Sequence, residues 1–411
     1  MEIVPGTWVA LRPRNVNGWI TSWLLLAGTA ALDASTAYSA DWGIEPRVEL
    51  GAIYNDNYEM ATLDGTELEV YGPLLDAQVT FRRSGPIDDL SLVPRILATY
   101  FPDEKDHDYT DYHLTGSWLH RGERTRSDFR ARWSHETVFQ SELPGTGIIG
   151  DLGDPDEGDT GRVTVRDSRD YFTFREELSY RLSDRTTLEG GAGYQVAEYD
   201  QTDPTARTNF KNLRGFAGLG WALSPTSTIK LLASAAQFEP DSGDDKTTYT
   251  GGLEWRRVVS ESQRMYARAG VRNTDRESSS SETGFSGGVG AQWSFEVTDV
   301  FVDLTTTLDP GGTGSLVERD QLRLNVTRQV TPRLDLNVGA RLFRETALGD
   351  EPGTDDLDYA AGSLGIEWRL SQQVALAAKY ELLWQEYHNE DSDARANIVT
   401  LSMIYAPARM K

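Results

Sequence analysis

The stretch ERDQLRLNVTRQVTPRLDLNVGARLFRE, from Glu318 to Glu345, indicates how this chain folds. Apolar side chains occupy every second position on both sides of a turn: Leu322, Leu324, Val326 and Val330 before it, and Leu334, Leu336, Val338, Ala340 and Leu342 after it. Successive side chains of a β-strand point to opposite faces, so this spacing predicts two antiparallel strands joined by a tight turn at Val330 to Arg333. Arg328 alone interrupts the apolar side.

The same alternation recurs along most of the chain. Alternating segments begin near Trp42, Glu69, Asp88, Thr110, Thr125, Asp167, Thr186, Asn209, Ser227, Lys246, Gln263, Thr283, Asp299, Val317, Arg333, Leu357, Gln373 and Arg395. These runs last roughly 10 to 15 residues, whereas strands of soluble sheets average about 5 to 6, and the greater length lets a tilted strand cross a bilayer. The sequence therefore predicts an all-β protein: a single antiparallel up-and-down transmembrane β-barrel of about 18 strands.

The connections between these segments alternate in length. Short turns recur at every second junction: Ser84 to Pro86, Arg121 to Glu123, Leu182 to Arg185, Ser224 to Thr226, Ser260 to Ser262, Val297 to Asp299, Thr331 to Pro332 and Ser371 to Gln372. Longer acidic connections lie between them: Asp103 to Asp111, Gln140 to Arg166, Asp241 to Asp245 and Asp350 to Asp358. This pattern predicts short periplasmic turns and long acidic extracellular loops. The acids between Gln140 and Arg166 lack the spacing of a calcium loop, so we expect a solvated loop and no metal site.

Composition supports one membrane-embedded domain. The 411 residues include no cysteine, so disulfides and thiolate metal sites are excluded. The formal net charge of -24 disfavours nucleic acid as a partner. No interior stretch approaches the roughly 20 apolar residues of a membrane helix. A large soluble all-β protein is the alternative.

The first residues have the pattern of a leader. Arg12 and Arg14 precede an apolar run from Trp19 to Leu32, and small residues follow from Ala34 to Ala40. A basic start, a short apolar centre and small residues near a cleavage site are typical of a secretory signal peptide. We predict a signal peptide over 1–39 and a barrel over 40–411 in a Gram-negative-type outer membrane. A retained membrane anchor is the alternative.

The face opposite the apolar one is rich in charge. Its charged side chains are predicted to line the lumen: Arg130, Arg132, Arg175, Glu177, Glu254, Arg256, Arg268, Arg323, Asp335, Arg341, Glu367, Arg369, Lys379 and Glu381. A basic residue facing lipid at the bilayer midplane costs about 2 to 4 kcal/mol, which favours an inward orientation. Glu176 and Arg328 fall on the lipid side in this register, and each marks a bulge, an interfacial position or a register error.

Two interiors fit this lining. Arginines that ring a water-filled lumen would select anionic or sugar-like solutes, whereas acids and bases paired across the lumen would plug it. A barrel of about 18 strands typically encloses an aqueous channel, so we expect a pore for diffusion or export of solutes. A structural or surface-binding barrel with a plugged lumen is the alternative.

Residues for catalysis are sparse. The five histidines, His107, His113, His120, His135 and His388, lie in no recognisable hydrolase motif, and surface or membrane-interface positions are expected for them. Neither a phosphate-binding loop nor a dinucleotide fingerprint occurs. We therefore predict a protein that is not an enzyme, with no catalytic residues and no cofactor.

The opening strand carries a family resemblance. The segment from Arg47 to Tyr58, in which Tyr54 precedes the pair Asp56-Asn57, resembles the start of outer-membrane β-barrel porins associated with exopolysaccharide or capsule systems. The resemblance implies an outer-membrane location and a role in passing or secreting polysaccharide. Its implied partners are outer-membrane lipid and lipopolysaccharide, the barrel-assembly machinery and polysaccharide-export components. Such barrels often end on an aromatic residue, whereas here the segment 406–411 follows Tyr405.

Overall fold

A computed structural model describes residues 41–61, 67–138, 167–200, 207–276, 280–311, 314–348, 356–388 and 392–407. The predicted signal peptide at 1–39 lies outside the described residues. The predicted loop from Gln140 to Arg166 lies outside them as well.

The described chain consists of strands and one short 3-10 helix, η1 (Lys105–His107). The strands are β1 (Asp41–Asn55), β2 (Val70–Ser84), β3 (Asp88–Thr99), β4 (Tyr109–Arg121), β5 (Thr125–Val138), β6 (Asp167–Arg181), β7 (Thr186–Tyr199), β8 (Phe210–Ser224), β9 (Ser227–Pro240), β10 (Lys246–Ser260), β11 (Gln263–Arg276), β12 (Glu282–Ser294), β13 (Thr298–Pro310), β14 (Leu316–Thr331), β15 (Leu334–Ala347), β16 (Leu357–Arg369), β17 (Val374–Tyr387) and β18 (Ser392–Tyr405). The predicted starts lie within three residues of these bounds.

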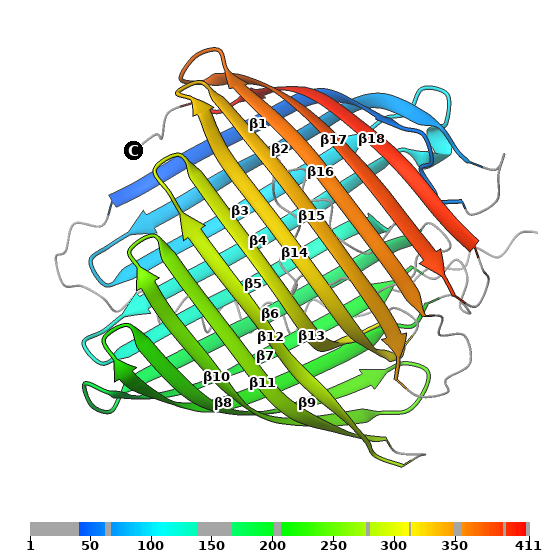
Figure 1. Cartoon of the computed structure of the whole chain (residues 1–411). Coiled ribbons are helices and arrows are strands. Elements are labelled where there is room, and N and C mark those ends of the chain that lie inside the picture. Colours follow the sequence, from blue (N-terminus) through cyan, green and yellow to red (C-terminus); the bar gives the residue numbers. More distant parts are fainter. Residues whose placement is uncertain are drawn as a thin grey trace, which may run out of the picture. The chain divides into compact units, whose positions relative to one another are not determined.

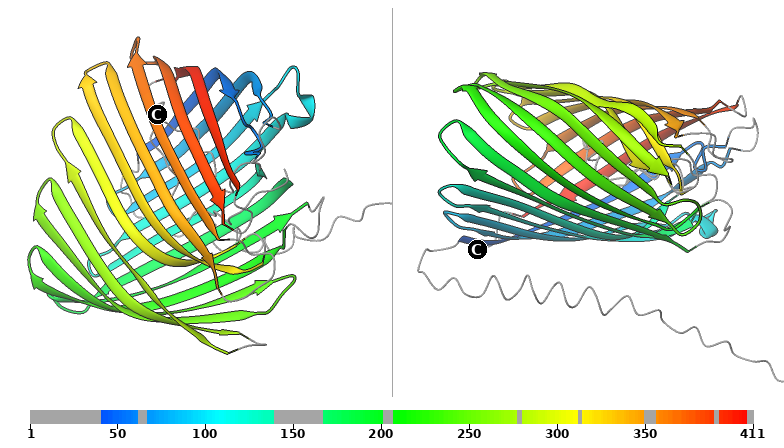
Figure 2. Two further views of the ribbon diagram at one scale, coloured as in Figure 1. Left: turned by 45° about the vertical axis from the view of Figure 1, so that its right-hand side comes forward. Right: turned by 90° about the horizontal axis from the view of Figure 1, so that it is seen from below.

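These strands form one closed antiparallel barrel. All 18 strands belong to one sheet, each pairing with its neighbour in the chain, and β1 pairs with β18 to close the ring. Figure 1 shows the tilted hairpins in sequence order, and Figure 2 shows the same strands from two further sides. The predicted all-β, up-and-down barrel is therefore confirmed.

Alternation along each strand separates two environments. On β14 the outward-facing Leu322 is 38% exposed, whereas its neighbour Gln321 is 2% exposed. Large apolar side chains are exposed on nearly every strand, among them Leu50, Leu178, Leu253, Leu304 and Leu401. In a closed single-layer sheet, a buried side chain points into the ring, so the polar face is the inner one. The outer face is a continuous apolar belt.

The turns that join consecutive strands are short on one side of the barrel. That side has the segments 122–124, 225–226, 261–262 and 332–333.

Two acidic residues that were assigned to long connections lie in strands instead. Asp111 is in β4 and Asp358 is in β16, because the alternating pattern begins earlier in each case than the run of acids suggests. The segment 388–391 is no longer than the turn 370–373, so the length rule has one exception.

The Asp56-Asn57 pair closes the barrel where β1 meets β18. The backbone N–H and side-chain Nδ2 of Asn397 donate to the Asp56 carboxylate at 2.6 and 2.7 Å. Asn57 Nδ2 donates to the carbonyl oxygens of Arg395 and Ala61 at 2.9 and 3.1 Å. The motif that carries the family resemblance therefore fastens the first strand to the last.

Two charged residues face outward as the register predicts. Arg328 lies beside a register shift between Gln329 and Thr331 at the end of β14, which places it at the edge of the apolar belt. Glu176 lies within β6, opposite Phe129 and Ala192 on the neighbouring strands, so it is a carboxylate in apolar surroundings. No helix of the described residues is long and apolar enough to span a bilayer.

Replacing Glu176 with leucine is expected to stabilise the barrel in a lipid bilayer. The change removes a carboxylate from the belt, and we expect a gain of about 1 kcal/mol in the free energy of unfolding. Urea unfolding of the refolded protein in vesicles measures it. Glu198→Leu is the control, since Glu198 faces outward at the long-loop end of β7. An equal gain in both variants would contradict a position inside the belt for Glu176.

Candidate functional site: the inward wall

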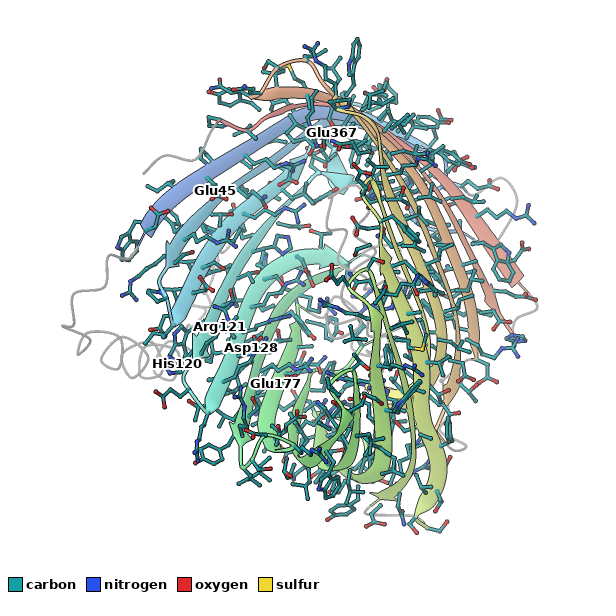
Figure 3. All side chains as sticks on the ribbon, turned by 60° about the vertical axis from the view of Figure 1, so that its left-hand side comes forward. Glu45, His120, Arg121, Asp128, Glu177 and Glu367 are labelled. Atoms are coloured by element: carbon teal, nitrogen blue, oxygen red, sulfur yellow. The ribbon has the colours of Figure 1, made fainter. Side chains whose placement is uncertain are left out.

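All of the side chains predicted to line the lumen lie on the inward side of their strands. Residues that pair directly across neighbouring strands point to the same face of the sheet. Arg323, for example, is opposite both Asp303 and Arg341, which are buried inside the ring. Glu177 and Glu367 are labelled among these side chains in Figure 3. The sequence pattern and the register therefore assign the same face to this set.

Inward side chains become more buried from the short-turn end of the barrel to the long-loop end. On β5 the Arg126 and Arg130 side chains are 59% and 62% exposed, whereas Arg132 and Glu136 are 11% and 6% exposed. On β10 Arg256 is 59% exposed, and Lys246 at the other end is buried. The inner wall is thus accessible in its short-turn half and closely packed in its long-loop half.

Ion pairs of the predicted residues run along the wall. Asp303 accepts two hydrogen bonds from Arg323, at 2.9 Å from Nε and 2.6 Å from Nη2, across adjacent strands. Lys379 lies 2.9 Å from Glu381 on the same strand. Further pairs on the same or an adjacent strand are Arg175 with Glu177, Arg256 with Glu254, and Arg369 with Asp335. These residues pair with neighbours along the wall, so their ion pairs do not cross the lumen.

Glycines on the inward face of β12 let side chains from β11 reach across it. A Cβ on Gly290 would overlap the Tyr266 ring, and Tyr266 donates a hydrogen bond to Asp303 on β13 at 3.3 Å. A Cβ on Gly284 would overlap the Arg272 guanidinium, which contacts Glu318 on β14. These two positions need glycine because another side chain occupies the space of the missing one.

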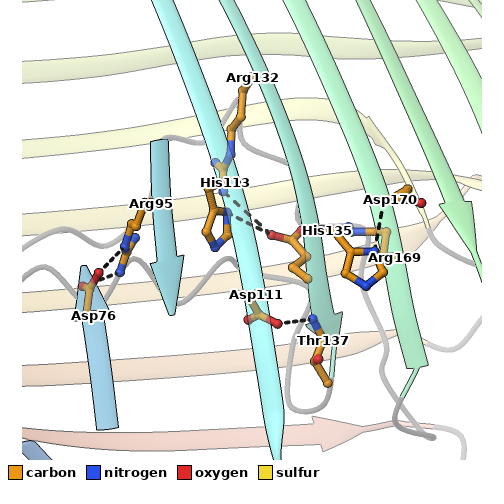
Figure 4. A network of polar contacts seen from close by, with 10 residues as sticks. Asp76, Arg95, Asp111, His113, Arg132, His135, Thr137, Arg169 and Asp170 are labelled. Carbon is orange, nitrogen blue, oxygen red and sulfur yellow. Dashed lines mark hydrogen bonds and ion pairs between the residues drawn. The ribbon is translucent and has the colours of Figure 1, made fainter. Parts of the chain in front are cut away.

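A polar network crosses β2 to β6 on the same wall (Figure 4). Arg95 binds Asp76 with both Nε and Nη2, at 2.8 and 2.9 Å. Glu136 accepts from Arg169 Nε at 3.1 Å, and its other oxygen is 3.8 Å from Arg132 Nη2. Buried charges persist where they are paired, so this network keeps five ionic side chains inside the wall.

The histidines do not form a catalytic group. His120 contacts Asp88 at 2.8 Å, and His135 contacts Asp170 at 3.0 Å, both on the outer side of the barrel. His113 instead faces the inner side with a side chain that is 9% exposed, which corrects the expected surface position. It lies opposite Ser134 on β5, yet that serine is fully buried, and neither His113 ring nitrogen has a hydrogen-bond partner among the described residues. An activated serine requires such a bond to a histidine.

Several buried inward residues were not singled out from the sequence. They include Asp76, Arg169, Asp303 and Arg319. Their signal was available, since each occupies the inward position of its alternating strand. No group of three or more metal-binding side chains occurs in the described ranges.

Comparisons with known proteins find likeness only among solved structures. No protein-family model matches the sequence, and no curated protein matches it. Pseudomonas aeruginosa OpdQ is 10% identical with a TM-score of 0.45, over 89% of this chain and 98% of that chain. P. aeruginosa OccK2 (OpdF), in complex with glucuronate, has the same identity, TM-score and coverage. The P. aeruginosa outer membrane protein opdK is 8% identical with a TM-score of 0.45, over 89% of this chain and 99% of that chain. At such values the likeness transfers no function to this chain.

Proposed function

We propose that this chain forms a non-enzymatic, water-filled pore of a Gram-negative-type outer membrane, through which polar solutes diffuse. The closed ring with an apolar outer belt supports the membrane location, because lipid-facing and inward residues alternate as a membrane barrel requires. The proposal includes export directed by the leader at 1–39, short turns in the periplasm and long loops outside.

The observation that carries the proposal is the arrangement of charge on the inner wall. Arginine and carboxylate side chains pair with neighbours on the same or adjacent strands, such as Arg323 with Asp303 and Lys379 with Glu381. In the short-turn half several of these side chains are more than 45% exposed, among them Arg130, Arg175 and Arg369. Exposed charge inside a ring requires water, so the wall supports a hydrated lumen.

Purified barrel in planar lipid bilayers is expected to produce stepwise increases in conductance. Each step reports insertion of one open barrel, because ions cross through the hydrated lumen. Folding is checked separately by the shift in gel migration between unheated and boiled samples. Folded protein that leaves the bilayers silent would reject the pore and favour a structural or surface-binding barrel.

Passage or secretion of polysaccharide is the second candidate. The observation that favours it is the resemblance carried by Tyr54 and Asp56-Asn57. Current block by saccharides of increasing length tests it: a polymer conduit should bind longer chains progressively more tightly. Affinity that does not change with chain length would favour small solutes. The lipopolysaccharide, assembly-machinery and export partners are proposals of the same origin.

A further inference from the structure

Three inward arginines form a compact group on β10 and β11. Arg256 lies directly opposite Tyr266, so Arg264 and Arg268, two residues to either side of Tyr266, are its diagonal neighbours. Diagonal neighbours in an antiparallel pair are about 7 to 8 Å apart, within reach of long side chains. We call Arg256, Arg264 and Arg268 the β10–β11 arginine group.

This group has few carboxylates for its charge. Arg256 Nε is 2.5 Å from Glu254, which is also 4.0 Å from Lys230, and Lys230 is 2.6 Å from Glu189. Within the described part of the chain, no ion pair of 4.0 Å or less joins Arg264 or Arg268 to a carboxylate. Four positive groups therefore face two acids, which leaves an excess of two positive charges in a chain of net charge -24.

Three other arginines of the wall, Arg130, Arg175 and Arg369, are compensated by carboxylates. Arg130 lies directly opposite Arg175, yet Arg130 is 3.4 Å from Asp128, and Arg175 contacts Glu177. Arg369 likewise contacts Asp335 and is 3.8 Å from Glu367. These compensated residues provide a matched reference for the β10–β11 arginine group.

The group is accessible, and its neighbours on β12 are uncharged. Arg256 is 59% exposed, and Arg264 and Arg268 are exposed as well, close to the short turn at 261–262. On β10 Arg268 lies opposite Glu254, the carboxylate that contacts Arg256. On β12 the positions opposite Arg264 and Arg268 are Gln292 and Gly288, so no charge opposes them on that strand and Gly288 adds no bulk. A solute entering from the short-turn mouth would reach the guanidinium groups directly.

We propose that Arg256, Arg264 and Arg268 bind an anionic group of a solute, a carboxylate or a phosphate. The planar fork of a guanidinium matches both anions in two-point hydrogen bonds. Because like charges on neighbouring strand positions are unfavourable, an anion between them offsets a cost that the fold leaves uncompensated. The inference rests on the proposed pore for the route to the site and adds a solute class to it.

Binding in detergent solution tests the site without requiring conduction. Isothermal titration calorimetry at low salt measures the affinity for succinate, for inorganic phosphate and for D-glucose. The triple variant Arg256→Gln, Arg264→Gln, Arg268→Gln is compared with Arg130→Gln, Arg175→Gln, Arg369→Gln, which loses the same charge from the same half of the wall. We expect saturable binding of at least one anion, weakened by at least about tenfold in the first variant and by less than about threefold in the second.

Equal losses in the two triple variants would overturn the site, as would glucose binding equal to that of the anions or no saturable binding at all. If the first variant fails to fold, Arg264→Gln alone gives the same reading, because this change breaks no ion pair of the described chain. Bilayer recordings separate the two proposals. Anion binding with silent bilayers would reject the pore and keep the site, whereas open channels without anion binding would reject the site and keep the pore.

Discussion

Replacing Asp303 with alanine is expected to destabilise the barrel by about 3 kcal/mol, the largest effect of any single polar change that we predict. Asp303 is 2% exposed and accepts hydrogen bonds from Arg323 at 2.9 and 2.6 Å and from Tyr266 at 3.3 Å. The variant leaves the Arg323 guanidinium, whose side chain is only 14% exposed, without its carboxylate. Urea unfolding of the refolded protein, followed by tryptophan fluorescence, measures the loss.

Two further variants show whether the buried pair is the cause. Asp335→Ala removes the partner of Arg369, whose side chain is 46% exposed, and should cost no more than about 1 kcal/mol because water screens that pair. The double variant Asp303→Leu, Arg323→Met removes both buried charges together, so it should recover most of the loss. A double variant as unstable as Asp303→Ala would show that shape at this site matters more than charge.

At the Asp303 site, the orientation of one side chain could be predicted from the sequence, whereas its partners could not. Alternation predicted that Arg323 points inward, because that property depends only on the period of a strand. Its partner was not predicted, since Asp303 lies on another strand and only the register of β13 with β14 brings the two together. The hydrogen bond from Tyr266 to Asp303 could not be predicted either, because it joins two strands that are not neighbours and passes over Gly290 on the strand between them.

Strand boundaries were predictable for a related reason. The apolar belt imposes a period of two on every strand, so β5, β7 and β11 begin where the alternation begins. Acidic composition was a poorer guide, and Asp111 shows why. Its carboxylate accepts a hydrogen bond from the Thr137 backbone N–H at 2.9 Å inside the wall. Aspartate is common in loops, but this one is part of a strand.

Closure of the ring was the step that the alternation could not locate. Any two edge strands of the right length satisfy the hydrophobic pattern, and a one-residue slip between them would turn every side chain to the wrong face. Here the register is fixed by polar contacts across the junction. Ser402 donates to the buried Glu49 carboxylate at 2.6 Å, and Asn397 donates to Asp56. The junction of β1 with β18 is therefore a seam specified by a few side chains.

Gly51→Ala is expected to weaken this seam by about 2 kcal/mol. A Cβ at Gly51 would lie 2.5 Å from the Leu401 carbonyl oxygen and 2.8 Å from the Ser402 Cβ, both on β18. The backbone oxygen cannot move without shifting the pairing of β1 with β18, so the strain acts directly on closure. The temperature at which the folded band disappears in heated detergent gels should fall.

Gly362→Ala is the matched control for the seam. It makes the same change on β16, where a Cβ would meet nothing within 4 Å. Both substitutions reduce the freedom of the unfolded chain equally, which favours folding by about 0.4 to 1 kcal/mol at a site without strain. The difference between the two variants therefore isolates the contact across the seam. A wild-type melting temperature in both variants would contradict the close pairing of Gly51 with Ser402 across the junction of β1 and β18. The polar contacts of Glu49 and Asp56 would then not be what closes the barrel.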